Sequence, residues 1–119
     1  LIGGFTADPY LVSGVAGGNV DISTEVQGCL GNVNFETPDV ILNYTPASFT
    51  LYVSSTSEGD ATLAILTPDG SWHCNDDTSG LNPGIEFPKP IPGLYSIWIG
   101  TYGGSNINAE LRISETSLF

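Results

Sequence analysis

Glycine and proline divide this chain into segments that are too short for most helices. The 119 residues include 15 glycines and 8 prolines, and most of these lie between short apolar stretches. No stretch keeps apolar residues at helical spacing over three turns, whereas several alternate apolar and polar residues as half-buried strands do. The sequence therefore predicts an almost entirely β fold, with strands in the segments NVDISTEV, DVILNY, FTLYVSS, TLAIL, SWHCN, GIEF, LYSIWIGTY and AELRISE.

Alternation within the segments assigns side chains to the two faces of a sheet. In DVILNY, for example, Val40, Leu42 and Tyr44 share one face. The sequence Pro68-Asp69-Gly70 predicts a tight turn that joins TLAIL and SWHCN as a hairpin. About eight short strands of this kind predict a single domain, residues 1–119, that folds as a two-sheet antiparallel β-sandwich of jelly-roll type.

The chain is strongly acidic although it carries few charges overall. Thirteen acidic residues oppose only Lys89 and Arg112, which gives a formal net charge of −11. Phosphate groups of nucleic acids and of anionic membranes would be repelled, so neither is an expected partner. No apolar run approaches the roughly 18 residues that a bilayer span requires, so we do not expect membrane insertion. Cations are the natural counterpart of this charge.

The two cysteines, Cys29 and Cys74, are far apart in sequence and form no CxxC pair. A zinc site would lack ligands, so a disulfide between them is the favoured interpretation. Such a bridge would stabilise the fold by about 4 kcal/mol in the chain-entropy model, provided that the compartment is oxidising. The first residues, LIGGF, lack the basic region of a signal peptide, so we expect a mature secreted, extracellular protein or an excised domain.

A longer set of motifs resembles a known family. DATLAILTPDGSWHCNDD is followed by GLNPGIEF and PGLYSIWIGTY, with GFTADP near the start and LRISE near the end. In this order, over most of residues 3 to 115, the motifs look like those of the bacterial pre-peptidase C-terminal-like (PPC) domain. The resemblance implies a secreted β-sandwich that accompanies hydrolases or stands alone, sometimes binds calcium and has no catalytic machinery. The family's calcium ligands do not map onto this sequence by motif.

Few residues could support enzymatic chemistry. A Ser-His-Asp arrangement needs an oriented histidine, and His73 is the only histidine in the chain. On a strand His73 would face away from Trp72, and a partly exposed, structurally neutral histidine is the simpler interpretation. Cys74 has a disulfide partner and no neighbouring positive charge beyond His73 that could activate it. We therefore expect a protein that is not an enzyme.

The loop CNDDTSGLNP offers oxygen ligands for a hard cation. Carboxylates such as those of Asp76 and Asp77 repel one another where a loop lets them converge, and a divalent ion relieves that repulsion. Asn82 adds a side-chain oxygen, and the next carboxylates are Asp60 before TLAIL and Asp69 in the predicted turn. These five residues predict a calcium site rather than the paired acids of a glycosidase. The alternative is an Asx-rich turn, in which the Asn-Asp-Asp run caps its own backbone amides.

Aromatic residues provide an alternative site, for sugars. The candidate platform is Trp72 with Tyr102, and Tyr95 and Trp98 are the other aromatic residues considered. Aromatic side chains of a β-sandwich more often fill its core, and we expect Trp98, within IWIG, to be buried. A carbohydrate-binding accessory module of a secreted hydrolase is therefore the alternative function, with an extracellular glycan as its partner.

The sequence has few residues that protect sheet edges. Lysine, proline and inward-pointing charges usually keep edge strands from pairing with other chains, and this chain has a single lysine. The apolar ends LIGGF and SLF add surface that must be covered. Self-assembly by strand addition or end-to-end packing follows, unless both ends fold back onto their own sandwich. The leading expectation is a secreted, non-catalytic module, stabilised by calcium, that acts in extracellular binding or self-assembly.

Overall fold

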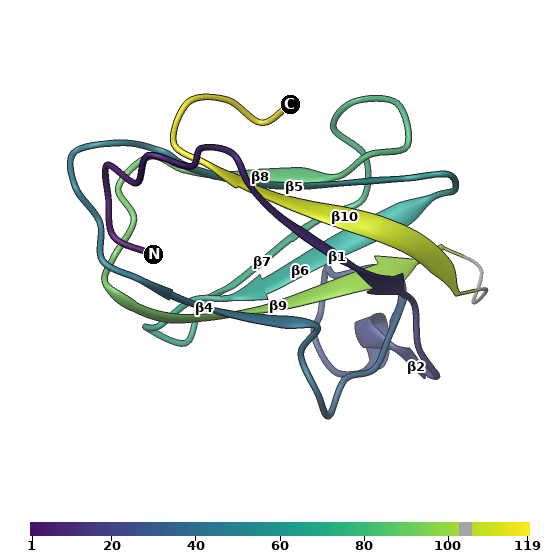
Figure 1. Cartoon of the computed structure of the whole chain (residues 1–119). Helices are drawn as coiled ribbons and strands as arrows, with labels where there is room; N and C mark the ends of the chain where they lie inside the picture. Colours follow the sequence, from purple (N-terminus) through teal and green to yellow (C-terminus); the bar gives the residue numbers. More distant parts are fainter. Residues whose placement is uncertain (103–105) are drawn as a thin grey trace.

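The computed structural model describes residues 1–102 and 106–119 and shows two antiparallel sheets packed face to face (Figure 1). One sheet has four strands in the order β1-β10-β5-β8. The other has six strands in the order β2-β3-β9-β6-β7, with β4 also paired to β9. The strands are β1 (Tyr10–Ala16), β2 (Val20–Asp21), β3 (Asn32–Val33), β4 (Val40–Tyr44), β5 (Leu51–Ser57), β6 (Ala61–Leu66), β7 (Trp72–Asn75), β8 (Gly84–Phe87), β9 (Gly93–Thr101) and β10 (Ile107–Ser114).

The predicted all-β, two-sheet sandwich is confirmed, with ten strands in place of about eight. Seven of the predicted segments correspond to β4 through β10, and the predicted turn joins β6 to β7 through a hydrogen bond from the Thr67 amide to the Ser71 carbonyl (2.9 Å). The jelly-roll type stays a prediction. Within the described residues no helix is long and apolar enough to cross a membrane.

The first third of the chain differs from the prediction. NVDISTEV was expected to be a strand, but only Val20–Asp21 pairs, and the chain then forms a 3-10 helix at Ile22–Thr24. The Asp21 carboxylate accepts hydrogen bonds from the Ser23 amide (3.0 Å) and hydroxyl (2.7 Å), and these local bonds compete with strand pairing. Strand β1 has no counterpart among the predicted segments, because Gly14 interrupts its apolar pattern and its outward residues are apolar.

The main core fills the space between the two sheets. Its residues come from the inward faces of both sheets, as the alternation of DVILNY and LYSIWIGTY predicts. Leu42 and Tyr44 are buried there, and so are Ile97 and Ile99, whereas Trp98 is buried on the other face of the same strand. The other core residues are Ala16, Leu51, Val53, Ala61, Leu63, Ile65, Ile85, Phe87, Tyr95, Ala109, Leu111 and Ile113.

A second, smaller cluster covers the outer face of the six-stranded sheet. Phe35, Trp72 and Trp98 stack with ring centroids 5.1 to 6.1 Å apart, and we call them the outer aromatic cluster. The predicted disulfide between Cys29 and Cys74 is confirmed, with Cα atoms 5.4 Å apart. It ties the segment after the 3-10 helix to strand β7, so that this segment covers the aromatic rings.

Both apolar ends of the described chain pack against its own sandwich. The backbone of Ile2 forms a parallel bridge with Thr45, next to the end of β4, and the Thr45 amide donates to the Leu1 carbonyl (2.8 Å). At the other end, the Ser54 hydroxyl of β5 donates to the Leu118 carbonyl. The alternative weighed for the ends LIGGF and SLF, that both fold back, is thus what the structure shows.

Candidate metal centre

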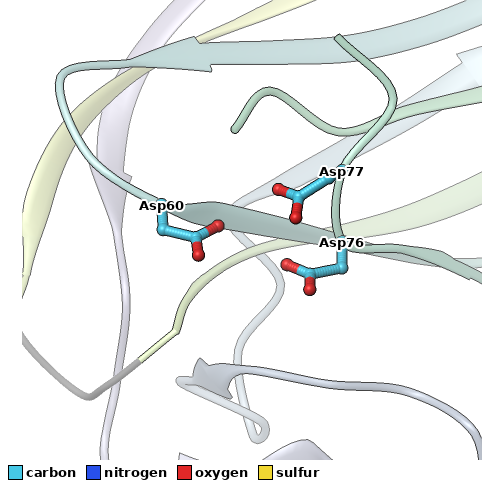
Figure 2. A group of neighbouring side chains, drawn as sticks. All are labelled: Asp60, Asp76 and Asp77. Atoms are coloured by element: carbon cyan, nitrogen blue, oxygen red, sulfur yellow. The ribbon is translucent and has the colours of Figure 1, made fainter. Parts of the chain in front are cut away.

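The β6–β7 hairpin places three aspartates at one end of the six-stranded sheet. Register pairs Leu63 of β6 with Asn75 of β7, so the start of β6 lies beside the end of β7. Asp60 immediately precedes β6, while Asp76 and Asp77 immediately follow β7. Figure 2 shows the three carboxylates turned toward a common space between the two segments. We call this group the acidic cluster.

The distances within the acidic cluster suit one divalent ion. Asp60, Asp76 and Asp77 each offer a carboxylate oxygen, and these three atoms all lie within 4.8 Å of one another. Calcium binds oxygen at about 2.4 Å, so two oxygens on the same ion are at most about 4.8 Å apart. The side chains therefore need little movement to share a calcium ion.

Two oxygens of the acidic cluster have no hydrogen-bond partner among the described residues. Oδ1 of Asp60 and Oδ1 of Asp76 are shielded from solvent and accept no hydrogen bond from the residues that the structure describes. Buried polar atoms are normally hydrogen-bonded, and an unpaired buried carboxylate oxygen is costly. Asp77 is exposed, so it can add a ligand from the solvent side. A cation between the three side chains would satisfy both shielded oxygens.

Burial and mutual repulsion raise the pKa of two cluster carboxyls. The pKa of Asp60 is raised first by burial, then by the negative charges of Asp77 and Asp76, and by a hydrogen bond with Asp77. The pKa of Asp76 is raised by burial and by the charge of Asp77. Both causes disfavour the charged carboxylates in the absence of a cation, and a divalent ion would reverse that preference.

The loop after β7 is organised by Asn75, not by the adjacent aspartates. Oδ1 of Asn75 accepts hydrogen bonds from the Gly84 amide (3.1 Å) and the Thr78 hydroxyl (2.8 Å), which close the loop against the start of β8. These bonds come from a hydroxyl and from an amide nine residues further on, so they are not the local Asx turn of the alternative interpretation. Among the described residues, neither Asp76 nor Asp77 caps a backbone amide in this way, which leaves their carboxylates available to a ligand.

The two remaining predicted ligands lie in different places. Asn82 closes the tip of the same loop, where its amide donates to the Ser79 carbonyl (3.0 Å) and its carbonyl accepts from the Thr78 amide (2.9 Å). Its side-chain oxygen stays a predicted ligand. Asp69 sits in the turn at the opposite end of the hairpin, roughly 20 Å away for a strand of six residues, so it is not part of the acidic cluster.

His73 lies on β7 with its side chain exposed and facing away from the outer aromatic cluster. Its ring packs edge-on against Phe87 of β8, with centroids 5.0 Å apart. It lines a shallow pocket together with Asp69, Glu86 and Tyr95. The hydroxyl of Tyr95 is already engaged there, because it donates to the Ile91 carbonyl (2.6 Å). The contacts of His73 are those of a packing residue at the side of the sandwich.

The candidate sugar platform is divided between two ends of one strand. Trp72 belongs to the outer aromatic cluster and pairs with Leu66 at the turn end of β6. Tyr102 is 62% exposed, and its amide donates to the Asp60 carbonyl (3.0 Å) at the other end of β6. The length of β6 therefore separates the two rings, and they do not form one continuous platform.

Comparison with known proteins adds no assignment to this geometry. No protein-family model matches the chain, and no curated protein matches it. The resemblance to the PPC domain consequently depends on the motifs of the sequence alone.

Proposed function

We propose that this chain is an extracellular, non-catalytic β-sandwich module that binds calcium at the acidic cluster and associates with copies of itself. The observation that carries the calcium proposal is the convergence of three carboxylates with two shielded, unpartnered oxygens. Backbone carbonyls, water and the Asn82 side chain would complete the six to eight ligands that calcium takes. The resemblance to the PPC domain and the disulfide support an extracellular setting.

Calcium would act on stability in this proposal. An ion that binds only the folded state stabilises it by about 2.7 kcal/mol at a hundredfold excess over its dissociation constant. For a domain of this size that corresponds to a rise in Tm of roughly 10 °C. Magnesium should replace calcium poorly, because it demands tighter octahedral geometry and releases its waters reluctantly.

Thermal unfolding followed by circular dichroism tests the proposal, with calcium, with magnesium and with a chelator. We expect the wild-type Tm to rise with calcium and to return with chelator. Asp60→Asn and Asp76→Asn should each remove most of this response, and Asn82→Ala should weaken it less. Glu36→Gln, which removes an exposed acid elsewhere, is the matched control and should respond as the wild type does. A full calcium response in Asp60→Asn/Asp76→Asn would overturn the assignment of the site.

The carbohydrate-binding alternative has less support. It needs a coplanar, exposed aromatic pair, and the structure separates Trp72 from Tyr102 by the length of β6. Trp72 is also engaged in the outer aromatic cluster, so its faces are partly covered.

A further inference from the structure

Strand β1 is the least protected edge of the sandwich. It is the first strand of the four-stranded sheet, and within the described residues only β10 pairs with it. Its seven residues, YLVSGVA, include no proline and no ionisable side chain apart from a tyrosine. A long, uncharged edge strand presents a row of free backbone N–H and C=O groups that another strand can pair with.

The other sheet edges are shorter or covered. Strand β8 has four residues and is followed by Pro88, and β2 has only two residues. Strand β7 also has only four residues. The end of β4 is occupied by the backbone of Leu1–Gly3 through Thr45. The usual devices against edge pairing are therefore present at these edges and absent from β1.

The outward side chains of β1 are apolar and exposed. Val12 and Ala16 pack on the core, so alternation turns Leu11, Ser13 and Val15 to the outer face. Leu11 is 50% exposed and Val15 is 53% exposed. Neither is fully covered by the side chains of residues 1–102 and 106–119, which leaves apolar surface directly beside unpaired backbone.

We propose that β1 pairs antiparallel with β1 of a second copy of this chain and joins the two four-stranded sheets into one. The inference rests on the proposed association of copies, for which it names the surface, and it does not depend on the calcium site. A two-fold axis through Ser13 places each Ser13 opposite its counterpart. Leu11 then lies opposite Val15 of the other copy, so the apolar residues of the edge cover one another.

Charge also permits this pairing, although each copy is strongly acidic. On the neighbouring strand β10, Glu110 lies opposite Ser13 and Arg112 lies opposite Leu11. Asp8, which precedes β1, accepts hydrogen bonds from Ser114 and from the Glu115 amide of its own chain. In the joined sheet the two Glu110 side chains would be three strand spacings apart, about 14 Å. That distance exceeds the screening length of about 8 Å at physiological ionic strength. The repulsion that remains comes from the net charge of −11, so salt should strengthen association.

Sedimentation velocity of the 119-residue chain over a range of concentrations tests whether β1 pairs with β1 of a second copy with Ser13 on the two-fold axis. The wild type should form dimers with rising concentration, and more readily at high salt. Ser13→Lys and Ser13→Glu each place like charges opposite one another on the two-fold axis and should raise the dimer dissociation constant about tenfold or more. An equimolar mixture of the two variants should form heterodimers, because the charges are then opposite.

Ser48→Lys is the matched control, since Ser48 is exposed on a loop outside β1, and it should dimerise as the wild type does. Circular dichroism and a cooperative thermal unfolding transition establish that each variant is folded. Val15→Lys is a second edge variant. A wild type that associates while Ser13→Lys, Val15→Lys and Ser48→Lys associate equally well would overturn the β1 pairing alone. A wild type that stays monomeric at every concentration and salt would overturn both the pairing and the proposed association, and would leave the calcium proposal standing.

Discussion

The pKa values of aspartates are shifted in opposite directions at the two ends of the β6–β7 hairpin. At the turn end, the Asp69 carboxylate accepts hydrogen bonds from the Thr67 hydroxyl and from the Ser71 amide (3.2 Å), and these bonds lower its pKa. At the open end, Asp60 and Asp76 have shielded oxygens to which no described residue donates, and their pKa values are raised. The same hairpin thus supplies one carboxylate with hydrogen-bond donors from its own turn, whereas among the described residues the other two carboxylates have shielded oxygens that receive none.

The largest expected effect comes from removing the disulfide, which ties β7 near the open end to the segment after the 3-10 helix. Cys74 lies two residues before Asp76, whereas the turn end is held by its own hydrogen bonds. Replacing Cys29 and Cys74 together by Ala should reduce the free energy of unfolding by about 4 kcal/mol, as the chain-entropy model gives for a loop of this length. Urea unfolding followed by circular dichroism measures this loss.

The same double variant sharpens the contrast between the two ends. Hydrogen exchange should speed up more at the amides of Asp76 and Asp77 than at the Ser71 amide, and calcium affinity should fall. Wild-type protein under non-reducing conditions is the control. Unchanged calcium affinity in the double variant would show that the acidic cluster is positioned without the disulfide.

Neutralising one carboxylate at each end should change stability in opposite directions. Without calcium, Asp76→Asn removes repulsion from Asp60 and Asp77, so we expect its Tm to rise by a few degrees. Asp69→Asn weakens the bonds to Thr67 and Ser71, so its Tm should fall. Calcium should erase the gain of Asp76→Asn relative to the wild type, but should not affect the loss in Asp69→Asn. If Asp76→Asn and Asp69→Asn changed the Tm in the same direction in the presence of chelator, the contrast between the two ends would be contradicted.

The pH dependence of stability should also differ between the ends, with a smaller effect. An unfolded aspartate has a pKa of about 3.9. Because the folded pKa values of Asp60 and Asp76 lie above this, the folded state binds more protons in the window between the two values. The calcium-free protein therefore gains stability from these groups as the pH falls toward 3.9 and loses it as the pH rises through their folded pKa values.

Asp69 behaves in the opposite way, because its folded pKa is lowered. Its contribution is present above about pH 3.9 and is lost as the pH falls through its folded pKa. Urea unfolding from pH 3 to pH 7 in chelator separates the groups: Asp76→Asn should flatten the upper part of the profile, and Asp69→Asn the lower part. Profiles that keep the wild-type shape in both variants would contradict these assignments.

Part of the acidic cluster follows from sequence reasoning on the hairpin. The turn residues Pro68-Asp69-Gly70 predict that TLAIL and SWHCN pair antiparallel, which brings Asp60 close to Asp76 and Asp77. The same reasoning places Asp69 at the other end, so its inclusion among the predicted ligands was wrong. The role of Asn75 was harder to predict, since it depends on a contact with Gly84 across the loop.

Edge protection shows the limit of sequence reasoning more clearly. The shortage of lysine indicated that some edge would be weakly protected, but not which one. Strand β1 was missed altogether, because its outward Leu11 and Val15 break the apolar-inside, polar-outside alternation by which strands are recognised. The apolar ends, which were candidates for contact between copies, instead form hydrogen bonds next to the end of β4 and to β5 of their own sandwich.

The sequence by itself determined the β class, the strands from β4 to β10, the burial of Trp98 and the pairing of Cys29 with Cys74. The strands and the burial of Trp98 follow from the alternation of side chains along a strand and from the residues of the turns. The disulfide follows because each cysteine has only one possible partner in the chain. Only the tertiary structure decided which carboxylate oxygens lack donors and which strand is left as an open edge. Both depend on contacts between residues far apart in the chain. The pKa of one aspartate can therefore be lowered while that of another in the same hairpin is raised.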